Sequence, residues 1–362
     1  MHGPAPKGPV DGLIDPGDFV SRTKYEKPRH LACRGFLHRT WERTKQKTIR
    51  KGRFRMITLV CPGFGYSARH YVALYGKRFD RTVGTTRSAT SAAALSARRF
   101  GDNAVDMLVF DGAAASPALA AAIADATVLL VSIGPDRDTD PVLAHLRDAI
   151  AAAPLLKSIV YLSTIAVYGN HEGRWIDETT PLAPALTRAA SRIDAERAWR
   201  ALGEAHGVPV AVIRIAGIYG PGANALEAVK AGRARRIIKP GQVFNRIHVA
   251  DLAQIIDKAV DRALGRRAGG VFNAADDDPT APGDPILFAA SLLGIAPPAE
   301  IAFEEAKKTM TPFAVSFYGE SKRVRNERVK SVLGVSLRYP TYREGLRALA
   351  NEPEPSGACG QN

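Results

Sequence analysis

A glycine-rich segment carries the clearest chemical signal in the sequence. It follows the apolar run ITLVC, precedes a helical pattern, and reads Gly63-Phe64-Gly65-Tyr66-Ser67-Ala68. In the matching pattern G-x-G-x-x-G/A, Gly63 permits a tight turn, Gly65 lets the backbone approach a pyrophosphate, and Ala68 allows close helix packing. The amino terminus of the next helix adds N–H donors and a positive dipole. The pattern predicts dinucleotide binding, and a glycine-rich turn without a ligand is the alternative.

The residue after the second apolar run bears on which dinucleotide would bind. NAD-binding sites carry a carboxylate about 20 residues beyond the glycines, where it holds the ribose hydroxyls. Here residues 84–88 read GTTRS and contain no acid. Arg87 stands in the acid's place and could pair with a 2′-phosphate, so the sequence favours NADP(H), with NAD(H) as the alternative. Arg69 is a second candidate for a phosphate contact, and a solvated surface charge is the alternative for both arginines.

The ends of later strand-like runs add predicted cofactor contacts. Asp111 and Gly112 follow the third run and are expected near an adenine, with an ordinary turn aspartate as the alternative. Parallel strands place their carboxyl ends at one edge of a sheet, where dinucleotides bind. The other contacts predicted at such ends are Ser132, Ile133, Ser163 and Ile218.

Three further segments carry a family resemblance. Residues 161–169 read YLSTIAVYG, residues 214–222 read RIAGIYGPG, and residues 245–251 read NRIHVAD. They resemble the S-[ST]-x-x-V-Y-G, R-x-x-x-[IV]-Y-G-P-G and I-H-V-x-D motifs of extended short-chain dehydrogenases/reductases, the nucleotide-sugar epimerase and dehydratase group. The resemblance runs in register from about residue 56 to 350, and it implies a nicotinamide cofactor.

In that family a Ser or Thr, a Tyr and a Lys cooperate in catalysis. The hydroxyl positions the substrate, the tyrosine exchanges a proton with it, and the lysine lowers the tyrosine pKa and binds the nicotinamide ribose. Thr164 falls at the Ser/Thr position. Aligning the next helix on Glu196 puts Arg188 at the tyrosine position and Arg192 at the lysine position. The chain therefore resembles an atypical branch that lacks the Tyr-x-x-x-Lys pair.

The two arginines change the expected chemistry. Arginine stays protonated at any working pH, so Arg188 cannot serve as the proton-exchanging group. Spacing of i and i+4 puts Arg188 and Arg192 on one helix face, which favours an anion-binding site over a proton relay, with solvated charges as the alternative. Tyr168 is the nearest phenol available for chemistry, and a packing role in the V-Y-G turn is its alternative.

The elements that must position these residues alternate along the chain from residue 56. Short runs rich in Val, Ile and Leu predict strands at Ile57–Cys61, Thr82–Thr86, Met107–Phe110, Val128–Ile133, Ser158–Ser163 and Val210–Ile215. Helical patterns between them cover Ala68–Arg78, Pro117–Asp125, Pro141–Ala152 and Ala189–His206. This alternation predicts an α/β fold, a doubly wound parallel sheet of the Rossmann type. After Gly220 the pattern loosens, which predicts a small C-terminal substrate lobe at about residues 222–245 and 275–340.

Most of the net positive charge comes from residues that precede this domain. The chain has 50 Lys and Arg against 36 Asp and Glu, a net charge of +14, and residues 1–55 alone hold 14 basic and 5 acidic residues. This extension is expected to be disordered or to reflect a mis-assigned start, with a nucleic-acid or membrane-binding arm as the less favoured alternative. Residues 351–362 are expected to form a polar tail.

Composition and cysteine count exclude several classes. A content of 46% hydrophobic and 24% charged residues is typical of a soluble globular protein. Three scattered cysteines argue against a disulfide framework or a zinc site, and no metal is expected. The apolar runs are too short to span a membrane, and the amino terminus lacks a secretory pattern. We expect a cytoplasmic protein that binds a small-molecule substrate. A homodimer is also expected, because many proteins of this fold are dimers.

Smaller signals are expected to be structural. His248 is predicted to bridge backbone groups rather than contact a substrate, and Asp251 to cap the helix Leu252–Leu264. The acids at 276–278 are predicted to form a solvated turn rather than a cation site. In the family the segment at 321–323 lines the substrate lobe, and a solvated start of the helix Val324–Leu333 is its alternative.

Two functions follow from these expectations. The first is an NADP(H)-dependent oxidoreductase or epimerase-like enzyme with a degenerate catalytic triad. Its substrate would be a small polar molecule, with an anionic molecule as one form of it. The second is a non-catalytic NADP(H)-binding sensor or regulatory module.

Overall fold

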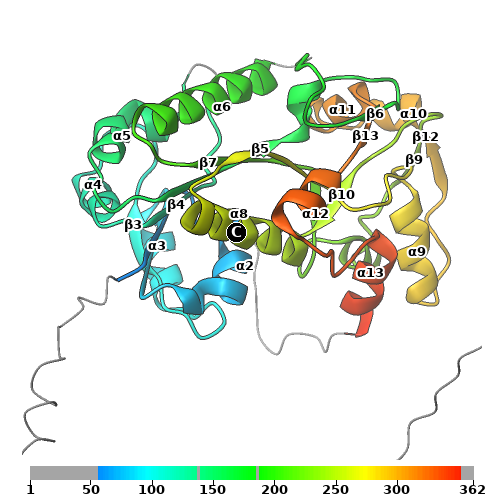
Figure 1. The fold of residues 1–362 in the computed structure, drawn as a ribbon. Helices are drawn as coiled ribbons and strands as arrows, with labels where there is room; N and C mark the ends of the chain where they lie inside the picture. The colour runs from blue at the N-terminus through cyan, green and yellow to red at the C-terminus, as the bar shows by residue number, and fades with distance from the viewer. Residues whose placement is uncertain (1–55, 137–138, 185–186, 352–362) are drawn as a thin grey trace, which may run out of the picture. The chain divides into compact units, whose positions relative to one another are not determined.

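The computed structural model describes residues 56–136, 139–184 and 187–351, and the basic extension and polar tail lie outside them. Seven parallel strands form the central sheet in the order β11-β7-β5-β4-β1-β2-β3 (Figure 1). The strands are β1 Thr58–Cys61, β2 Arg81–Thr86, β3 Asp106–Val109, β4 Val128–Val131, β5 Ser158–Thr164, β7 Val210–Ile215 and β11 Gly270–Ala274. The α/β, Rossmann-like prediction is confirmed.

Continuous apolar runs form the middle strands because both faces of the sheet are covered. In β1, Leu59 packs into one hydrophobic cluster and Val60 into the other, as the period of two in a strand requires. All four residues of β4 are buried. The strand order reverses between β1 and β4, so the carboxyl ends of these two strands border the crevice where ligands of such sheets bind.

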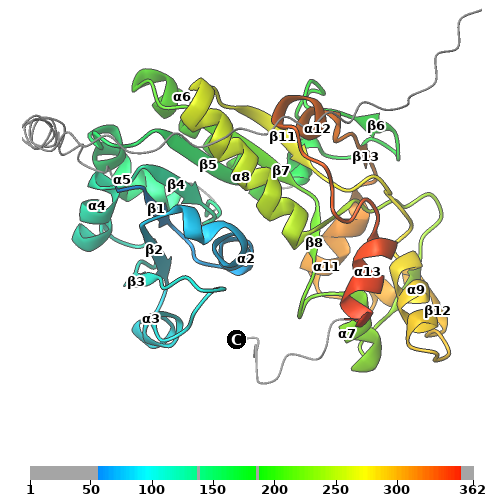
Figure 2. The ribbon, with the colours of Figure 1, turned by 60° about the horizontal axis from the view of Figure 1, so that its bottom comes forward.

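Helices cover the two faces separately (Figures 1 and 2). The first cluster includes residues of α2 Tyr66–Tyr75, α3 Ala89–Ser96, α8 Val249–Arg266 and α12 Glu327–Leu333. The second includes residues of α4 Pro117–Ala124, α5 Pro141–Ala151 and α6 Thr187–Ala205. Buried Asp140 caps α5 by accepting from the N–H groups of Val142 and Leu143, and it also accepts from Trp199 Nε1, which ties α5 to α6.

Three short parallel pairs join distant parts of the chain beyond the carboxyl edge of the sheet. They are β8 Gly217–Tyr219 with β10 Arg246–His248, β9 Arg236–Ile238 with β12 Glu300–Ala302, and β6 Trp175–Ile176 with β13 Arg323–Val324. The helices of this region are α7 Ala225–Lys230, α9 Asp284–Leu292, α10 Phe303–Lys307, α11 Pro312–Ser316 and α13 Tyr342–Asn351. The 3₁₀ turns are η1 Gly76–Arg78 after α2, η2 Ile165–Tyr168 after β5 and η3 Phe317–Gly319 after α11. Three small apolar clusters, around Tyr219 and Tyr342, around Tyr318, and around Ile176 and Val324, hold this region together.

One helix start differs from the sequence prediction. Helix α8 begins at Val249, and His248 caps it by accepting from the Ala250 N–H through Nδ1. The prediction that Asp251 caps this helix is wrong, because its buried carboxylate instead accepts from the backbone N–H groups of Arg338 and Tyr339. The structural role expected for His248 agrees with its place.

The acidic run at 276–278 is solvated only in part. Asp277 is exposed and accepts from Asn326 and Lys330, and Asp278 is half-buried and pairs with Arg343. For Asp276, which is 2% exposed, the prediction of a solvated turn is wrong, because this residue follows β11 directly into the protein interior. Within the described residues, no three side chains of metal-binding type gather at one place, and no helix has both the length and the apolar composition to cross a bilayer.

Candidate active site

The glycine loop between β1 and α2 is shaped by its neighbours. Gly63 has φ +84°, and a Cβ there would lie 2.8 Å from Ile133 Cγ1 and 2.9 Å from Ser132 Oγ, so only glycine fits. The Gly63 N–H donates to Thr85 Oγ1 over 2.8 Å, and the Ser132 hydroxyl donates to the Gly63 carbonyl. The loop is thereby fixed to the ends of β2 and β4.

Gly65 has a different surrounding. It is exposed, and a Cβ built on it would meet no atom within 4 Å. It caps α2 without any side-chain hydrogen bond, and the first turn of α2 holds no acid. The N–H groups of this turn therefore face open space at the positive end of the helix dipole. These features fit the pyrophosphate of a dinucleotide.

Two side chains of the loop region make contacts that the sequence did not indicate. Arg69 Nε donates to the Phe64 carbonyl over 3.0 Å, so this guanidinium braces the loop itself. The Tyr66 hydroxyl donates to the Pro221 carbonyl over 3.0 Å. That bond connects the glycine loop with the Y-G-P-G segment, although 155 residues separate them.

The residues predicted around the adenine end lie at the carboxyl ends of β2 and β3. Arg87 is exposed, and within the described part of the chain it has neither an ion pair nor a hydrogen bond. Asp111 accepts from the Ala113 N–H, as a turn aspartate does, and the Gly112 carbonyl accepts from His145. A contact between Arg87 and a phosphate thus stays a prediction.

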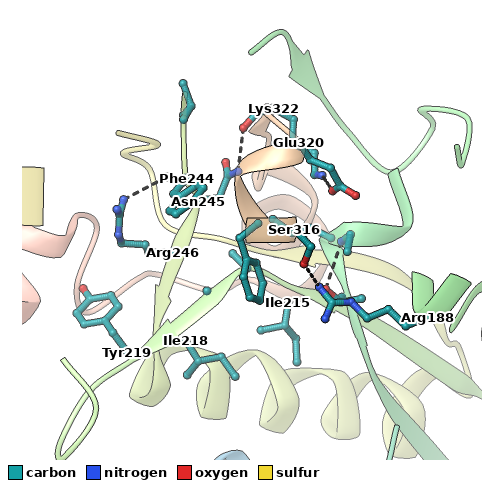
Figure 3. Close-up of a pocket in the computed structure, with 17 residues that line it drawn as sticks. Arg188, Ile215, Ile218, Tyr219, Phe244, Asn245, Arg246, Ser316, Glu320 and Lys322 are labelled. Carbon is teal, nitrogen blue, oxygen red and sulfur yellow. Dashed lines mark hydrogen bonds and ion pairs between the residues drawn. The ribbon is translucent and has the colours of Figure 1, made fainter. Parts of the chain in front are cut away.

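A pocket of about 350 Å³ opens beyond the ends of β5 and β7 (Figure 3). Thr164 and Ile215, the last residues of the two strands, line it. Figure 3 shows Arg188 and Ser316 on one side of the pocket and Tyr219 and Arg246 on the other. The remaining lining residues are Ile165, Ala166, Ala216, Gly217, Ile218, Val243, Phe244, Asn245, Phe317, Glu320 and Lys322.

The two arginines of α6 have separate partners. Arg192 Nη1 donates to the Leu162 carbonyl over 2.9 Å, and its guanidinium lies against Gly134 after β4. Arg188 lines the pocket, and its Nη2 donates to Ser316 Oγ over 3.0 Å. The structure thus brings Thr164 and Arg188 to one pocket and places Arg192 beside the loop that follows β4.

Tyr168 lies away from this pocket. Its side chain is fully buried, its hydroxyl donates to Asn273 Oδ1 over 2.8 Å, and it accepts from Arg214 Nη1 over 2.9 Å. Arg214 forms a buried ion pair with Glu196, which also accepts from the Ser163 hydroxyl. The geometry matches the packing alternative for Tyr168. Ser163 belongs to the same buried network, which connects the end of β5, next to Thr164, with α6.

Lys322 and Glu320 form a second buried ion pair, on the wall of the pocket. Lys322 Nζ lies 2.5 Å from Glu320 Oε2 and donates to the Gly169 carbonyl over 2.7 Å. The lysine side chain is 6% exposed, and burial lowers its pKa. An ammonium has three protons, so one remains beyond these two partners.

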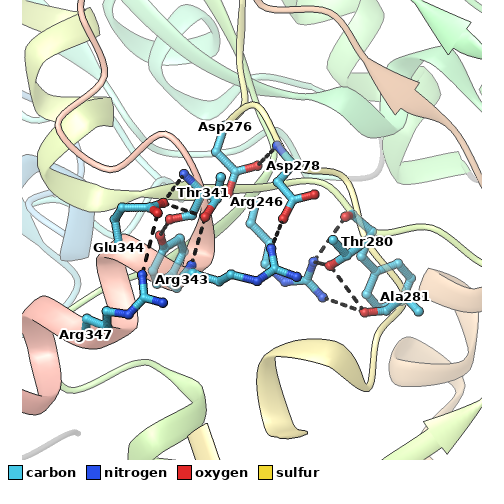
Figure 4. Close-up of polar contacts among 11 residues, drawn as sticks. Arg246, Asp276, Asp278, Thr280, Ala281, Thr341, Arg343, Glu344 and Arg347 are labelled. Atoms are coloured by element: carbon cyan, nitrogen blue, oxygen red, sulfur yellow. Dashed lines mark hydrogen bonds and ion pairs between the residues drawn. The ribbon is translucent and has the colours of Figure 1, made fainter. Parts of the chain in front are cut away.

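Arg246 lines the opposite side of the pocket, and Figure 4 shows it and Asp276 among the polar contacts of this region. The Arg246 guanidinium is held by the Phe244 and Ala281 carbonyls and by Thr280 Oγ1. Asp276 Oδ1 accepts from the Asp278 N–H, and its buried Oδ2 has no partner among the described residues. Burial raises the pKa of Asp276 to about 8.

Comparison with known proteins identifies the family. The family model of the NAD dependent epimerase/dehydratase family matches residues 63–275, more than half of the chain. The chain belongs to this family. The match spans the glycine loop, the end of β5 and the Y-G-P-G segment, so it includes most of the candidate active site. A search of curated protein sequences returned no match.

Solved structures agree with the family assignment. A functionally unknown conserved protein from Silicibacter pomeroyi is 44% identical, with a TM-score of 0.69, over 81% of this chain and 98% of that chain. The dTDP-glucose 4,6-dehydratase from Bacillus anthracis in complex with NAD is 18% identical, with a TM-score of 0.63, over 81% and 95%. The human epimerase family protein SDR39U1 with NADPH is 16% identical, with a TM-score of 0.60, over 81% and 99%. The last two show a shared fold.

Several pocket residues of this family member were missed from sequence. Glu320, Phe317 and Arg246 carry no motif signal of their own, and Lys322 was indicated only as part of the family segment at 321–323. The buried pair of Glu196 and Arg214 had a signal, since both stand in the family motifs, but the motifs do not say that they contact each other.

Proposed function

We propose that this protein binds NADP(H) and acts as an oxidoreductase or epimerase-like enzyme on a small polar substrate. The observation that carries the proposal is that the glycine loop and the 350 Å³ pocket lie at the same edge of the parallel sheet. The family assignment supports it, as do the solved relatives with NAD and NADPH. When bound, the nicotinamide supplies or accepts a hydride.

The chain's own residues supply the other parts of such a reaction. The Thr164 hydroxyl accepts from the Ala166 N–H, so its proton can point to a substrate oxygen. Burial lowers the pKa of Lys322 on the pocket wall, and its ammonium is proposed to donate the proton that the oxygen gains when a carbonyl is reduced. Arg192 is proposed to hold a ribose hydroxyl or phosphate.

The alternative is a non-catalytic NADP(H)-binding sensor. The observation in its favour is that, among the described residues, the phenol of Tyr219, which lines the pocket, and that of Tyr168 are already hydrogen-bonded to the protein. The Tyr168 hydroxyl is buried in the Arg214 network, and the Tyr219 hydroxyl donates to the Thr341 carbonyl while burial raises its pKa. A family member of this kind would bind the dinucleotide without converting a substrate.

Two measurements separate these functions. Purified protein is titrated calorimetrically with NADPH and NADH, and is then incubated with NADPH and a panel of carbonyl compounds. Binding with turnover supports the enzyme, and binding without turnover at high protein concentration supports the sensor. Failure to bind either dinucleotide contradicts both.

Arg87 provides the test of cofactor preference. An aspartate at this position would repel a 2′-phosphate, so Arg87→Asp is expected to weaken NADPH binding at least about tenfold while changing NADH binding little. The matched control is Arg200→Asp, an exposed arginine far along α6. If the ratio of the two affinities does not change in Arg87→Asp, the residue does not contact the cofactor.

A further inference from the structure

Arg188 differs from the other cations of the pocket in having neither a carboxylate partner, as Lys322 has, nor several hydrogen bonds to the protein, as Arg246 has. Lys322 is paired with Glu320, and the Arg246 guanidinium is surrounded by three protein oxygens. Arg188 donates to the neutral Ser316 hydroxyl, and in the described part of the chain it meets no carboxylate. One positive charge at the pocket is therefore available to a ligand.

Two aromatic rings hold this guanidinium in place. Its central carbon lies 4.3 Å from the ring centre of Phe313 and 5.3 Å from that of Phe317. Both phenylalanines are unusually exposed for their type, at 61% and 49%. The two rings lie at 88° to each other, so they flank the guanidinium without enclosing it. A guanidinium has five N–H donors, and those not used on Ser316 are open to a planar anion.

The rest of the pocket is mainly apolar. Its volume of about 350 Å³ lies at the small end of the range for ligand sites, which is about 300–1,000 Å³. Most of the side chains that line it are aliphatic or aromatic, including Ile165, Ile215, Ile218, Val243 and Phe244. An occupant with one charged end and an apolar body would match both parts.

We propose that the pocket binds a small organic carboxylate, with its carboxylate on the edge of Arg188 and its apolar body against Ile215 and Phe244. This rests on the proposed function, because the carboxylate would be its substrate class. A carboxylate carries one charge and fits the guanidinium fork with two hydrogen bonds. A diphosphate would bring further charges, but Lys322 already pairs with Glu320 and Arg246 already makes three hydrogen bonds to protein oxygens, so burying those charges would be costly.

The test uses the full chain saturated with NADPH and four probes, with binding followed by calorimetry. The probes are cinnamate, its neutral isostere cinnamamide, acetate, which has the charge without the body, and phenyl phosphate. We expect cinnamate to bind at least about tenfold more tightly than each of the others. Equal binding of cinnamate and cinnamamide, tighter binding of phenyl phosphate, or no binding of cinnamate at millimolar concentration would overturn the proposal.

Arg188→Gln tests the residue itself. It is expected to weaken cinnamate binding about tenfold and to leave cinnamamide binding unchanged, and Arg188→Lys is expected to restore part of the loss. Arg188 is exposed, so the variant should fold, and an unchanged melting temperature and NADPH affinity verify this. Arg200→Gln is the control. An unchanged cinnamate affinity in Arg188→Gln refutes the proposed contact between Arg188 and the carboxylate. If the unaltered protein does not bind NADPH, the proposed function is refuted instead.

Discussion

Burial determines which side chains near the pocket carry charge at neutral pH. Lys322 and Glu320 stay paired on the pocket wall, whereas Asp276 has one carboxylate oxygen without any partner among the described residues. A carboxylate in that position is costly when ionised, and this cost is the cause of its raised pKa. His248 shows the opposite shift, because burial lowers its pKa to about 4 and keeps the imidazole neutral.

Asp276 is therefore expected to make stability depend on pH. Its pKa rises from an ordinary 3.8 to about 8 on folding, so the folded state binds the extra proton and is favoured below about pH 4, and this stability is lost as the pH rises toward about 8. Asp276→Asn mimics the neutral form. The free energy of unfolding of the Asp276→Asn variant minus that of the unaltered protein should grow by up to about 1.4 kcal/mol per pH unit as the pH rises from about 5 to 8.

Urea denaturation at several pH values measures this difference. His248 titrates in the other direction below about pH 6.5, so the interval above that value isolates Asp276 best. Parallel pH profiles for the two proteins would show that Asp276 is already ionised in the folded state.

At the scale of elements, the β1 strand, its loop and helix α2 form a unit in which two glycines have different tasks. Gly63 has a positive φ and almost no space for a Cβ, because Ile133 and Ser132 lie against it. Gly65 has ordinary backbone angles, with φ −86°, and open space above it. The fold requires a glycine at position 63, and we propose that a ligand accounts for the glycine at position 65.

A pair of alanine variants separates these tasks. Gly63→Ala is expected to lower the free energy of unfolding by about 1–3 kcal/mol, through backbone strain and overpacking. Gly65→Ala is expected to leave stability within about 0.5 kcal/mol but to weaken NADPH binding about tenfold, because its methyl group would occupy the approach of the pyrophosphate. Thermal denaturation and calorimetry on both variants provide the check, and full NADPH affinity in Gly65→Ala would contradict a phosphate at this loop.

Local patterns explain which elements were predictable. The loop after β1 and the first six strands of the sheet were predicted because apolar runs and glycine spacing are visible within a few residues. Strand β11, with the sequence GVFNA, was missed because glycine and asparagine interrupt its apolar residues, and its pairing with β7 shows it to be a strand. The pairing of Lys322 with Glu320 and the burial of Asp276 depend on tertiary contacts in the same way.

At the scale of the whole molecule, the pocket depends on contacts between distant parts of the chain. Asn245 is the clearest case. Its buried side-chain amide donates to the Lys322 carbonyl and accepts from the Val324 N–H, each over 2.9 Å. One side chain thus fixes the wall that carries Lys322 to the strand β10.

Asn245→Ala is expected to lower the free energy of unfolding by about 2–4 kcal/mol, because it leaves two buried backbone groups without partners. Binding of NADPH should not change, since the glycine loop lies elsewhere on the sheet edge. The control is Asn224→Ala, which removes the cap of α7 and a hydrogen bond to the Gly220 carbonyl and should cost about 1 kcal/mol. Urea denaturation compares the variants, and equal losses would mean that Asn245 does not anchor the wall.

The pairing of β13 with β6 has a consequence for the order in which the protein is made. All seven strands of the sheet and the glycine loop precede residue 275, whereas the pocket wall is complete only once Arg323 and Val324 reach Trp175 and Ile176. Contacts between segments so far apart in sequence form late, because the intervening loop must first be closed. A nascent chain would therefore complete the sheet and its glycine loop on the ribosome before it completes the pocket.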